Sequence, residues 1–489
     1  MTTPDNDTFA MVMQELQDLR AKLTGQAKQA AGRLDLMHAE EEIRRALDAL
    51  GREVVSEVLS AADIDEQEIT VNGTLHGRID RRRVRIHTSF GPVEVEQTVY
   101  GRGRGNPTVA PMEKQLGLVE TYYTPKCAKV LCHLSAVTVR DEGDELLREF
   151  GGISVGAATM HRLPLAVMAR YEKERDVIER AVRERSFVPP GAVSMQVGLD
   201  GVMVAQDGEH SDARGREPRG DPDPPRHERR YGVLTAGPNA IDDKTGAAWH
   251  EASVGTLAFY DADGHHLSTA YVGRMPEEKK ATLGQMLRDE AMRALEDCPD
   301  LTPVLASDGA HTHWDILGEI HQAMPEAARA RVVWLVDFWH STEHLQDACD
   351  LIDRKGSSRA QVRRAELAET LKTYPDGVDR VLASLRYHRR TLRASAREDF
   401  DDVIGFLKNN RYRMAYKEAV DAHLPIATGH TEAAAKTLVG VRMKRSGARF
   451  SQHGGQTVLT LRASLKSHRF DDLFEILSRE YKAAIKRAA

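Results

Sequence analysis

Cysteine is scarce in this chain, and its few copies stand far apart. The 489 residues include 4 cysteines, whose spacing forms neither a CxxC metal knuckle nor a dense disulfide framework. This cysteine usage fits a reducing compartment, so the sequence predicts a cytoplasmic protein. The chain also lacks any uninterrupted apolar stretch of about 18 residues, and its first residues, MTTPDNDTFAMVMQEL, lack the basic-then-apolar pattern of a signal peptide. We therefore expect neither a membrane partner nor export.

Acidic residues are missing from one long stretch near the C-terminus. Overall the chain carries 74 acidic and 68 basic residues, and its formal net charge of -6 argues weakly against a protein that coats nucleic acid. Between Glu432 and Asp471, however, no Asp or Glu occurs. The basic residues of this stretch are Lys436, Arg442, Lys444, Arg445, Arg449, Arg462, Lys466 and Arg469. The distribution therefore indicates a local basic surface that the average conceals.

The length fits about three domains, and the first pattern along the chain is helical. Residues 8–62 carry apolar side chains at spacings of three and four, which is typical of amphipathic helices. We expect an N-terminal helical region at 1–65 that packs against other elements or associates with itself.

Residues 66–105 have the pattern of a β-hairpin. Two alternating runs, RVRIHTSF and VEVEQTVY, meet at a turn containing Gly91 and Pro92. The strand that leads into this turn is rich in arginine. These side chains fit contacts with phosphate and a solvated strand edge equally well. They are Arg78, Arg81, Arg82, Arg83 and Arg85.

Residues 106–190 are predicted to be mostly helical. Within them, VTVRDEGDELLREFGGISVGAATMHRL contains a helix, a break at Gly151–Gly152, Ser154 as a plausible N-cap, and a short second helix. This is the outline of a helix-turn-helix, whose second helix can enter the major groove of DNA. Many helical hairpins share the outline without touching DNA, so both interpretations stay open.

From residue 191 the pattern changes to strands. An alternating run ends at Asp200, and after a polar loop at 207–230 come a strand, a turn, a strand and a helix. Two short apolar runs, TPVLASDGA and RVVWLVDFWH, follow with a helix between them. This order predicts an α/β fold, a mixed sheet flanked by helices. Its expected parts are a core at 191–345, an all-helical insertion at 346–425, and closing helices at 426–489.

Two acidic residues mark the predicted strand ends. Asp200 ends the first strand, Asp308 ends the fourth, and each is followed by Gly, at the edge of the sheet where ligands gather. Two neighbouring carboxylates stay ionised together only beside a cation, and Mg²⁺ prefers such oxygen ligands. Glu432 can supply a third carboxylate to a two-metal site that acts on a phosphodiester. The alternative is that these Asp-Gly pairs are ordinary turns, since the chain has other such pairs.

A resemblance to a known family adds to this interpretation. The run LPIATGHTEAAAKTLVGVRMKRSGARFSQHGGQTVLTLRA, with DFWHSTEHL and SDGA upstream, resembles bacterial insertion-sequence transposases of the ISKra family. These are DDE transposases with an RNase H-like core, relatives of the Mutator-like group. The resemblance covers residues 190–480, while the N-terminal half fits more loosely. Relatives often carry a cysteine pair after the hairpin, where this chain has YGRGRGNP, so any zinc knuckle at that place is absent.

The resemblance implies roles for particular residues. It implies that Asp200, Asp308 and Glu432 are the catalytic acids and bind Mg²⁺, which Mn²⁺ can replace. It also places His340 of DFWHSTEHL near the scissile phosphate, although His340 could instead cap a helix whose neighbouring aromatic residues are core. His311 and His313 are weaker candidates. The predicted DNA-binding residues are Lys436, Arg442, Lys444, Arg445 and Arg449, with Arg81, Arg82 and Arg83 of the hairpin.

The implied function is transposition of an insertion sequence. Such an enzyme cuts the ends of its element and joins the freed 3′-hydroxyls to target DNA, acting as a homo-oligomer on DNA in the nucleoid of a bacterium. Two alternatives stay open: a metal-dependent nuclease without strand transfer, and an inactive descendant that only binds DNA. The intact acids argue against the inactive descendant.

Overall fold

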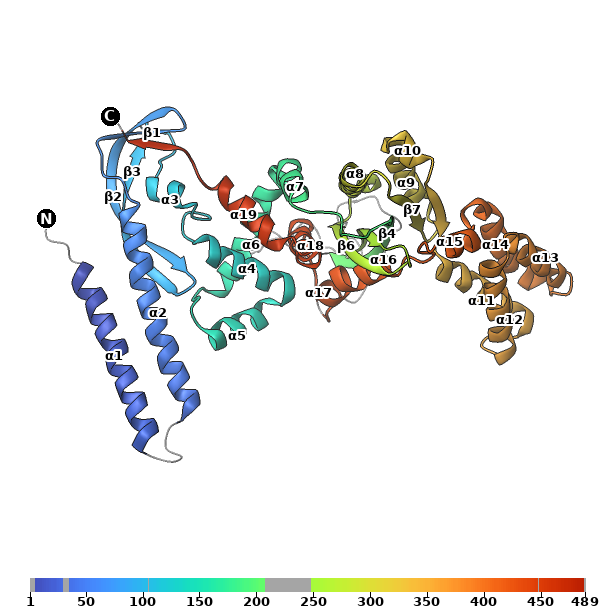
Figure 1. Cartoon of the computed structure of the whole chain (residues 1–489), viewed down its shortest axis with the longest axis horizontal. Coiled ribbons are helices and arrows are strands. Elements are labelled where there is room, and N and C mark those ends of the chain that lie inside the picture. The colour runs from blue at the N-terminus through green and yellow to red at the C-terminus, as the bar shows by residue number, and fades with distance from the viewer. Residues whose placement is uncertain (1–4, 30–34, 104, 207–247, 447, 488–489) are drawn as a thin grey trace, which may run out of the picture. The chain divides into compact units, whose positions relative to one another are not determined.

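A computed structural model describes residues 5–29, 35–103, 105–206, 248–446 and 448–487 (Figure 1). The expected polar loop at 207–230 lies outside these residues. The chain forms two compact units: Met1–Val182 with Asp471–Ala489, and Arg183–Phe470. This division differs from the expected one, because the last residues belong to the first unit and not to the core.

The first unit opens with the two helices that its periodicity predicts. They are α1 (Asp5–Gln29) and α2 (Leu36–Ala61). Asp35 caps α2 by accepting a hydrogen bond from the backbone N–H of His38 at 3.3 Å. Leu59 of α2 is buried in a small core with apolar residues of the sheet described next. The N-terminal region is therefore helical, as expected.

A four-stranded antiparallel sheet follows, in the order β3-β2-β1-β9. The predicted hairpin is confirmed, but its turn is Ser89–Phe90, because Thr88 pairs with Gly91. The Thr88 hydroxyl closes this turn by accepting from the Phe90 N–H at 3.0 Å and donating to the Gly91 carbonyl at 2.6 Å. The strands are β1 (Glu68–Val71), β2 (Thr74–Thr88), β3 (Gly91–Gly101) and β9 (Ile485–Arg487).

The predicted helical region contains α3 (Pro111–Leu116), α4 (Pro125–Val137), α5 (Arg140–Phe150), α6 (Ala157–Lys173) and α7 (Arg175–Glu184). Two details of the expected helix-turn-helix are wrong. The N-cap of α6 is Gly156 and not Ser154, and α6 has 17 residues and is not short. A Cβ atom on Gly152 would overlap the Ser89 carbonyl, so the Gly-Gly break packs tightly against the hairpin turn.

The second unit contains a mixed five-stranded sheet, which confirms the α/β fold. The strand order is β6-β5-β4-β7-β8, with β4, β5 and β6 antiparallel and β4, β7 and β8 parallel. The strands are β4 (Ser194–Gln206), β5 (Ala248–Tyr260), β6 (His266–Arg274), β7 (Thr302–Ser307) and β8 (Val333–Val336).

Helices connect and cover these strands (Figure 1). Between β6 and β8 lie a 3₁₀ turn (Glu278–Lys280), α8 (Ala281–Asp297), α9 (His311–Ala323) and α10 (Glu326–Arg329). The predicted insertion is helical: α11 (Phe338–Asp353), α12 (Ser358–Thr373), α13 (Gly377–Arg389), α14 (Ala394–Asn409), a 3₁₀ turn (Arg411–Arg413) and α15 (Tyr416–Asp421).

The closing segment is less regular than the single helix that its sequence predicts. A π-helix (Ala435–Gly440) interrupts it, between α16 (Gly429–Ala434) and α17 (Val441–Met443). Then come α18 (Gln452–Lys466) and α19 (Phe470–Glu480). No helix in the described part of the chain has both the length and the apolar character needed to cross a membrane.

The side chains of β4 alternate between two cores. Met195 and Val197 pack with residues of α8 and α9, such as Leu287 and Leu317. Val204 packs with residues of the π-helix and α18. Because successive residues of a strand point to opposite faces, Asp200 shares its face with Val204, the face that the π-helix and α18 cover.

Candidate active site

Asp200 lies inside a strand and not at its end, which corrects the sequence prediction. It pairs with Val254 of β5, and β4 continues to Gln206. The antiparallel partner β5 sustains the strand through the Asp200–Gly201 pair, although such pairs are common in turns. On the opposite edge of β4, the parallel pairing with β7 stops at Gly198 and Ala306. Asp200 therefore has a strand on one side and a strand end on the other.

The structure brings Asp200 and Asp308 together. Each follows the last β4–β7 pair, Gly198 and Ala306, by two residues. Neighbouring strands lie about 4.8 Å apart, so the two carboxylates begin from adjacent backbone positions. Burial raises the pKa of Asp200, and the Asp308 carboxylate raises it further. The register of the two parallel strands therefore places these acids at neighbouring backbone positions.

Hydrogen bonds hold one oxygen of each carboxylate. Asp308 Oδ1 lies 3.0 Å from Ser307 Oγ, 3.0 Å from the Ala310 N–H and 3.2 Å from His313 Nδ1. Asp200 Oδ1 accepts from the Gly201 N–H at 2.7 Å. Among the described residues, no protein donor reaches Oδ2 of either acid. These two oxygens are the atoms that can accept a ligand.

The two carboxyl groups have opposite pKa shifts. Burial raises the pKa of Asp200; the Gly201 N–H opposes this effect and Asp308 adds to it. Burial alone would also raise the pKa of Asp308, but hydrogen bonds from His313, Ala310 and Ser307 hold it well below its usual range. A bound cation would favour the ionised form of both. Two partly buried carboxylates, each with one oxygen that no donor among the described residues reaches, therefore form a pair of ligands suited to a divalent metal.

His313, which the sequence offers as a weaker candidate, is buried beside Asp308. Its side chain is 4% exposed and lies between Asp308 and Lys280, with its Nε2 atom 3.0 Å from Lys280 Nζ. Lys280 also forms an ion pair with Glu251 of β5. The sequence signal was the position of His313 five residues after Asp308, at the start of a helix. His311, by contrast, is exposed.

The DFWH segment has a structural role at its aspartate. Asp337, and not His340, caps α11: its carboxylate accepts from the His340 N–H at 2.7 Å. The same carboxylate accepts from the backbone N–H of Thr428 and, at 2.7 Å, from its hydroxyl. Asp337 thus ties the end of β8 to the segment that leads into α16. Of its aromatic neighbours, Phe338 is buried but Trp339 is 61% exposed, so the expected aromatic core is only partly present.

His340 lies at the first turn of α11 with a partly exposed side chain. Its Nδ1 atom is 3.3 Å from Glu343 Oε2, and its ring contacts Phe406 edge to face. Phe406 in turn lies 3.1 Å from where a Cβ atom on Gly309, the residue after Asp308, would stand. Phe406 therefore lies between His340 and the segment that follows Asp308. The His340 imidazole pairs with Glu343, and not with Asp200 or Asp308.

Glu432 belongs to a well-anchored helix, but its carboxylate does not join the pair in this structure. Thr431 Oγ1 lies 2.7 Å from Thr256 Oγ1, and a Cβ atom on Gly198 would overlap the Thr431 hydroxyl. The α16 backbone is thus fixed against the sheet two residues before Asp200. The Glu432 side chain is 65% exposed and pairs with Lys436 at 2.7 Å.

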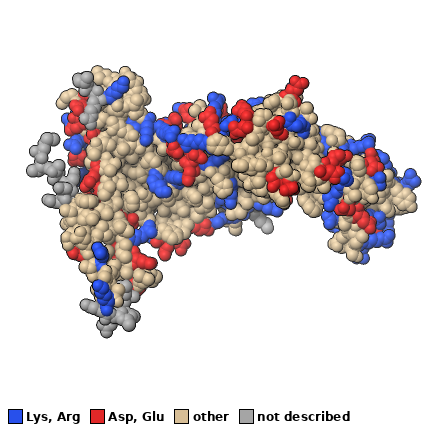
Figure 2. Space-filling model, in the orientation of Figure 1, with Lys and Arg blue, Asp and Glu red and all other residues tan. Residues whose placement is uncertain are grey.

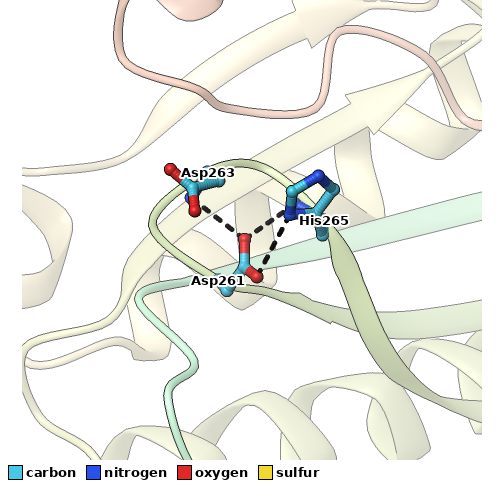
Figure 3. A group of neighbouring side chains, drawn as sticks. All are labelled: Asp261, Asp263 and His265. Atoms are coloured by element: carbon cyan, nitrogen blue, oxygen red, sulfur yellow. Dashed lines mark hydrogen bonds and ion pairs between the residues drawn. The ribbon is translucent and has the colours of Figure 1, made fainter.

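Within the described residues, one group of three His, Cys, Asp or Glu side chains could hold a metal ion. One ligand atom from each lies within 4.8 Å of the others. This group is not the predicted triad. The group is Asp261, Asp263 and His265, in the turn between β5 and β6 (Figure 3). Asp261 Oδ1 accepts from the backbone N–H groups of Asp263 at 3.0 Å and His265 at 2.8 Å. These bonds lower the pKa of Asp261. The turn itself accounts for this arrangement.

The basic stretch after Glu432 divides into two kinds of residue. Arg462 is buried and donates to the carbonyls of Leu438, at 2.9 Å, and Thr437, so it supports the π-helix. Arg469 pairs with Glu290 at 2.6 Å. Lys436, Lys444 and Arg449 are exposed, and Arg442 lies over the Phe450 ring. The predicted helix ends at Met443, so Lys444 and Arg445 follow it; Gly447 lies outside the described residues.

The arginines of the hairpin lie close to acidic residues of β3 and of α3. Arg81 pairs with Glu96 at 3.4 Å, and Arg82 lies 3.9 Å from Glu113. Arg83 is the cross-strand neighbour of Glu96. Opposite charges facing each other across an antiparallel pair stabilise the hairpin. Their ion pairs therefore support the solvated-edge interpretation, while their exposure leaves contact with phosphate open.

Comparison with known proteins adds no relative. No protein-family model matches the chain, and no curated protein matches it. The function is therefore inferred from the geometry of Asp200, Asp308 and the residues around them.

Proposed function

We propose that this protein is a DDE transposase with an RNase H-like core, which cuts the ends of its insertion sequence and transfers the freed strands to target DNA. The observation that carries the proposal is the pair Asp200 and Asp308, each two residues beyond the last pair of the adjoining parallel strands β4 and β7. The strand order β6-β5-β4-β7-β8, antiparallel on one side and parallel on the other, supports an RNase H-like core. The resemblance of the C-terminal motifs supports the finer assignment.

The acids of the pair have the chemistry that a metal-dependent phosphodiester reaction requires. Asp200 and Asp308 would hold Mg²⁺, or Mn²⁺ in its place, through the oxygens that no protein donor among the described residues occupies. The bound metal supplies neutralisation of phosphate charge and activation of the attacking oxygen. His313, Ser307 and the Ala310 N–H hold Asp308 in place, so this ligand is pre-organised before substrate binds.

Glu432 is the third acid of the proposal. Its helix is anchored by Thr431 against β4 and β5, and Thr428 is tied to Asp337. The backbone near Glu432 is therefore fixed on the sheet face that Asp200 shares. The side chain is exposed and pairs with the exposed Lys436, and such a surface pair contributes little stability. A rotation of the Glu432 side chain away from Lys436 would make its carboxylate available.

DNA is the proposed partner. Lys444, Arg445 and Arg449 extend from the end of α17, the continuation of the Glu432 segment, and would neutralise phosphates beside the acids. The α5–α6 pair and the hairpin arginines would contact the element's ends. Figure 2 shows Lys and Arg also gathered over the helices of the insertion, with Asp and Glu among them. These helices are a further surface on which DNA could lie.

Self-association is part of the proposal. Six large apolar side chains on α2 are exposed, Met37 among them. The other five are separated by seven, four, seven and four residues: Leu36, Ile43, Leu47, Val54 and Val58. This spacing places them along one side of the helix. It is close to the repeat by which two helices of the same sequence pack together. We assign this stripe to a second copy of the chain.

Replacement of the acids tests the proposed function. Asp200→Asn and Asp308→Asn should each abolish DNA cleavage in Mg²⁺ while leaving the unfolding transition nearly unchanged. Because the acids act as a unit, the double variant should be no worse than either single variant. Ca²⁺ should support binding without cleavage. Cleavage that persists in either variant would refute the assignment, and cleavage without joining of the freed 3′ ends would favour a nuclease.

A further inference from the structure

Lys280 is a charged residue near Asp308 whose backbone conformation and side-chain exposure are both unusual. It is the N-cap of α8, with φ 53° and ψ 36°, and Lys279 before it has φ 53° and ψ 16°. Two successive non-glycine residues in the left-handed region are strained, and such strain persists where the surrounding structure enforces it. The Lys280 side chain is 13% exposed. The unusual backbone conformation thus positions a nearly buried ammonium group.

The Lys280 ammonium group lies between Glu251 and His313. Lys280 Nζ forms an ion pair with Glu251 and lies 3.0 Å from His313 Nε2. A Cβ atom on Gly201 would overlap the Glu251 carboxylate, so this acid packs against the residue that follows Asp200. Glu251 pairs with Met203, so its side chain and that of Asp200 lie on opposite faces of the sheet. Lys280 therefore pairs with an acid on the sheet face opposite Asp200, and it reaches Asp308 only through His313.

The contact with Lys280 fixes how His313 bonds. A lysine ammonium group has hydrogens to donate and no acceptor, so His313 Nε2 must accept from it. The hydrogen of the neutral ring is then on Nδ1, which faces Asp308 Oδ1 at 3.2 Å and Ser307 Oγ at 3.0 Å. Without the ammonium group, the opposite tautomer would become available, and its Nδ1 atom would face the carboxylate without a hydrogen.

We propose that Lys280 is a positioning residue for a divalent-cation site at Asp308: it holds His313 in the Nδ1–H tautomer, which in turn orients the Asp308 carboxylate. The inference rests on the proposed function, because it takes Asp200 and Asp308 as the metal ligands. Residues that orient a ligand in this way typically change metal affinity or activity by about 10- to 100-fold when replaced. We assign no contact with substrate to Lys280.

The test measures binding of Mn²⁺ alone to the full-length protein, by electron paramagnetic resonance titration without DNA. Lys280→Met should weaken Mn²⁺ binding by about 10- to 100-fold. The matched control is Lys279→Met, which removes the same side chain from the adjacent, exposed residue with the same left-handed backbone. It should bind Mn²⁺ like the unmodified protein. Asp308→Asn should lose the site.

A second variant keeps the test decisive if the lone Glu251 carboxylate unfolds Lys280→Met. The pair Glu251→Gln with Lys280→Met removes both charges and should fold while binding Mn²⁺ as weakly. Histidine ¹⁵N spectra give an independent readout, with the His313 signals identified by their absence in His313→Gln. They should show Nδ1–H in the unmodified protein and a mixture of tautomers in the Lys280 variants.

The outcomes separate the inference from the proposed function. If Asp308→Asn loses Mn²⁺ binding but folded Lys280 variants retain full affinity, the role of Lys280 is refuted and the metal site stands. An Nε2–H tautomer in the unmodified protein would refute it as well. If Asp308→Asn binds Mn²⁺ as tightly as the unmodified protein, the metal site itself is contradicted.

Discussion

At the scale of single residues, the position of the third acid depends on a glycine. Gly198 leaves room on β4 for the Thr431 hydroxyl, which in turn contacts Thr256. No side chain fits at this position without displacing the Thr431 side chain of α16, the helix that carries Glu432. The close approach of helix and strand is thus a condition for any active site that includes Glu432.

Gly198→Ala tests this contact. The added methyl group would overlap Thr431 Oγ1, so we expect a loss of about 1–3 kcal/mol in the free energy of unfolding. We also expect slower DNA cleavage. Chemical denaturation and a cleavage assay measure the two effects, and Thr431→Ala in the same chain should restore part of the stability.

The control is Gly318→Ala, at a glycine inside α9 where a Cβ atom meets nothing within 4 Å. Alanine there should stabilise the protein by about 0.5–1 kcal/mol. If Gly198→Ala is as stable and active as the unmodified protein, α16 is not fixed by this contact.

Residue-scale chemistry was also the hardest to predict from the sequence. The position of the His313 ring beside Asp308 depends on its burial and on its contact with Lys280, a residue 33 positions away in the chain. The run EEKKATLGQML is typical of a continuous helix, so nothing in it signals that Lys279 and Lys280 adopt left-handed conformations. Both features arise from tertiary contacts, which local periodicity does not contain.

At the scale of elements, the basic residues that follow Glu432 fall into two groups, one that stabilises the fold and one that is proposed to bind DNA. Arg462 and Arg469 bond to other elements of the fold, whereas Lys444 is exposed and Arg445 donates to the Val441 carbonyl of its own segment at 3.3 Å. A stability role for the first two and a DNA role for the second two can therefore be measured apart.

Lys444→Ala with Arg445→Ala should weaken binding to specific and random DNA alike. Each phosphate contact that the substitutions remove should lower the slope of log affinity against log salt by about 0.9, and the unfolding transition should stay in place. Titrations at several salt concentrations give this slope. Arg329→Ala with Lys482→Ala removes two exposed charges that lie outside the proposed DNA contacts and serves as a control. An unchanged slope in the Lys444 and Arg445 variant would exclude these contacts.

The strands and helices of the core were predictable because each has its own apolar period. The end of β4 was not, because Asp200 and Gly201 look like a turn and only the distant partner β5 keeps them extended. The segment 432–445 was predicted to be a regular helix, but part of it is a π-helix, and Arg462 donates hydrogen bonds to two of its backbone carbonyls. Local sequence therefore locates elements well, and the contacts between them decide where they end.

At the scale of the whole molecule, the last residues return to the first unit. The strand β9 pairs with β1, for example Ile69 with Arg487, and three residues are too short a strand for periodicity to reveal. A fragment of residues 1–189 would lack this strand, so tests of end recognition require the full chain.

Self-association through α2 is the molecular-scale prediction. Leu47→Glu with Val54→Glu places charges within the exposed apolar stripe and should shift the protein toward monomer in sedimentation equilibrium, since burying unpaired charges is costly. Val177→Glu with Val362→Glu makes the same change at exposed apolar residues outside α2 and should leave the association state unchanged. Equal association of both variants would show that the stripe is not the interface.

The position of a bound metal tests the central claim most directly. Crystals of the full-length protein grown with Mn²⁺ and measured at the manganese absorption edge would locate the ion by its anomalous signal. We predict a peak beside Oδ2 of both Asp200 and Asp308, with the Glu432 carboxylate turned from Lys436 toward it. A peak confined to the turn of Asp261, Asp263 and His265, with none at Asp200 and Asp308, would contradict the proposed active site.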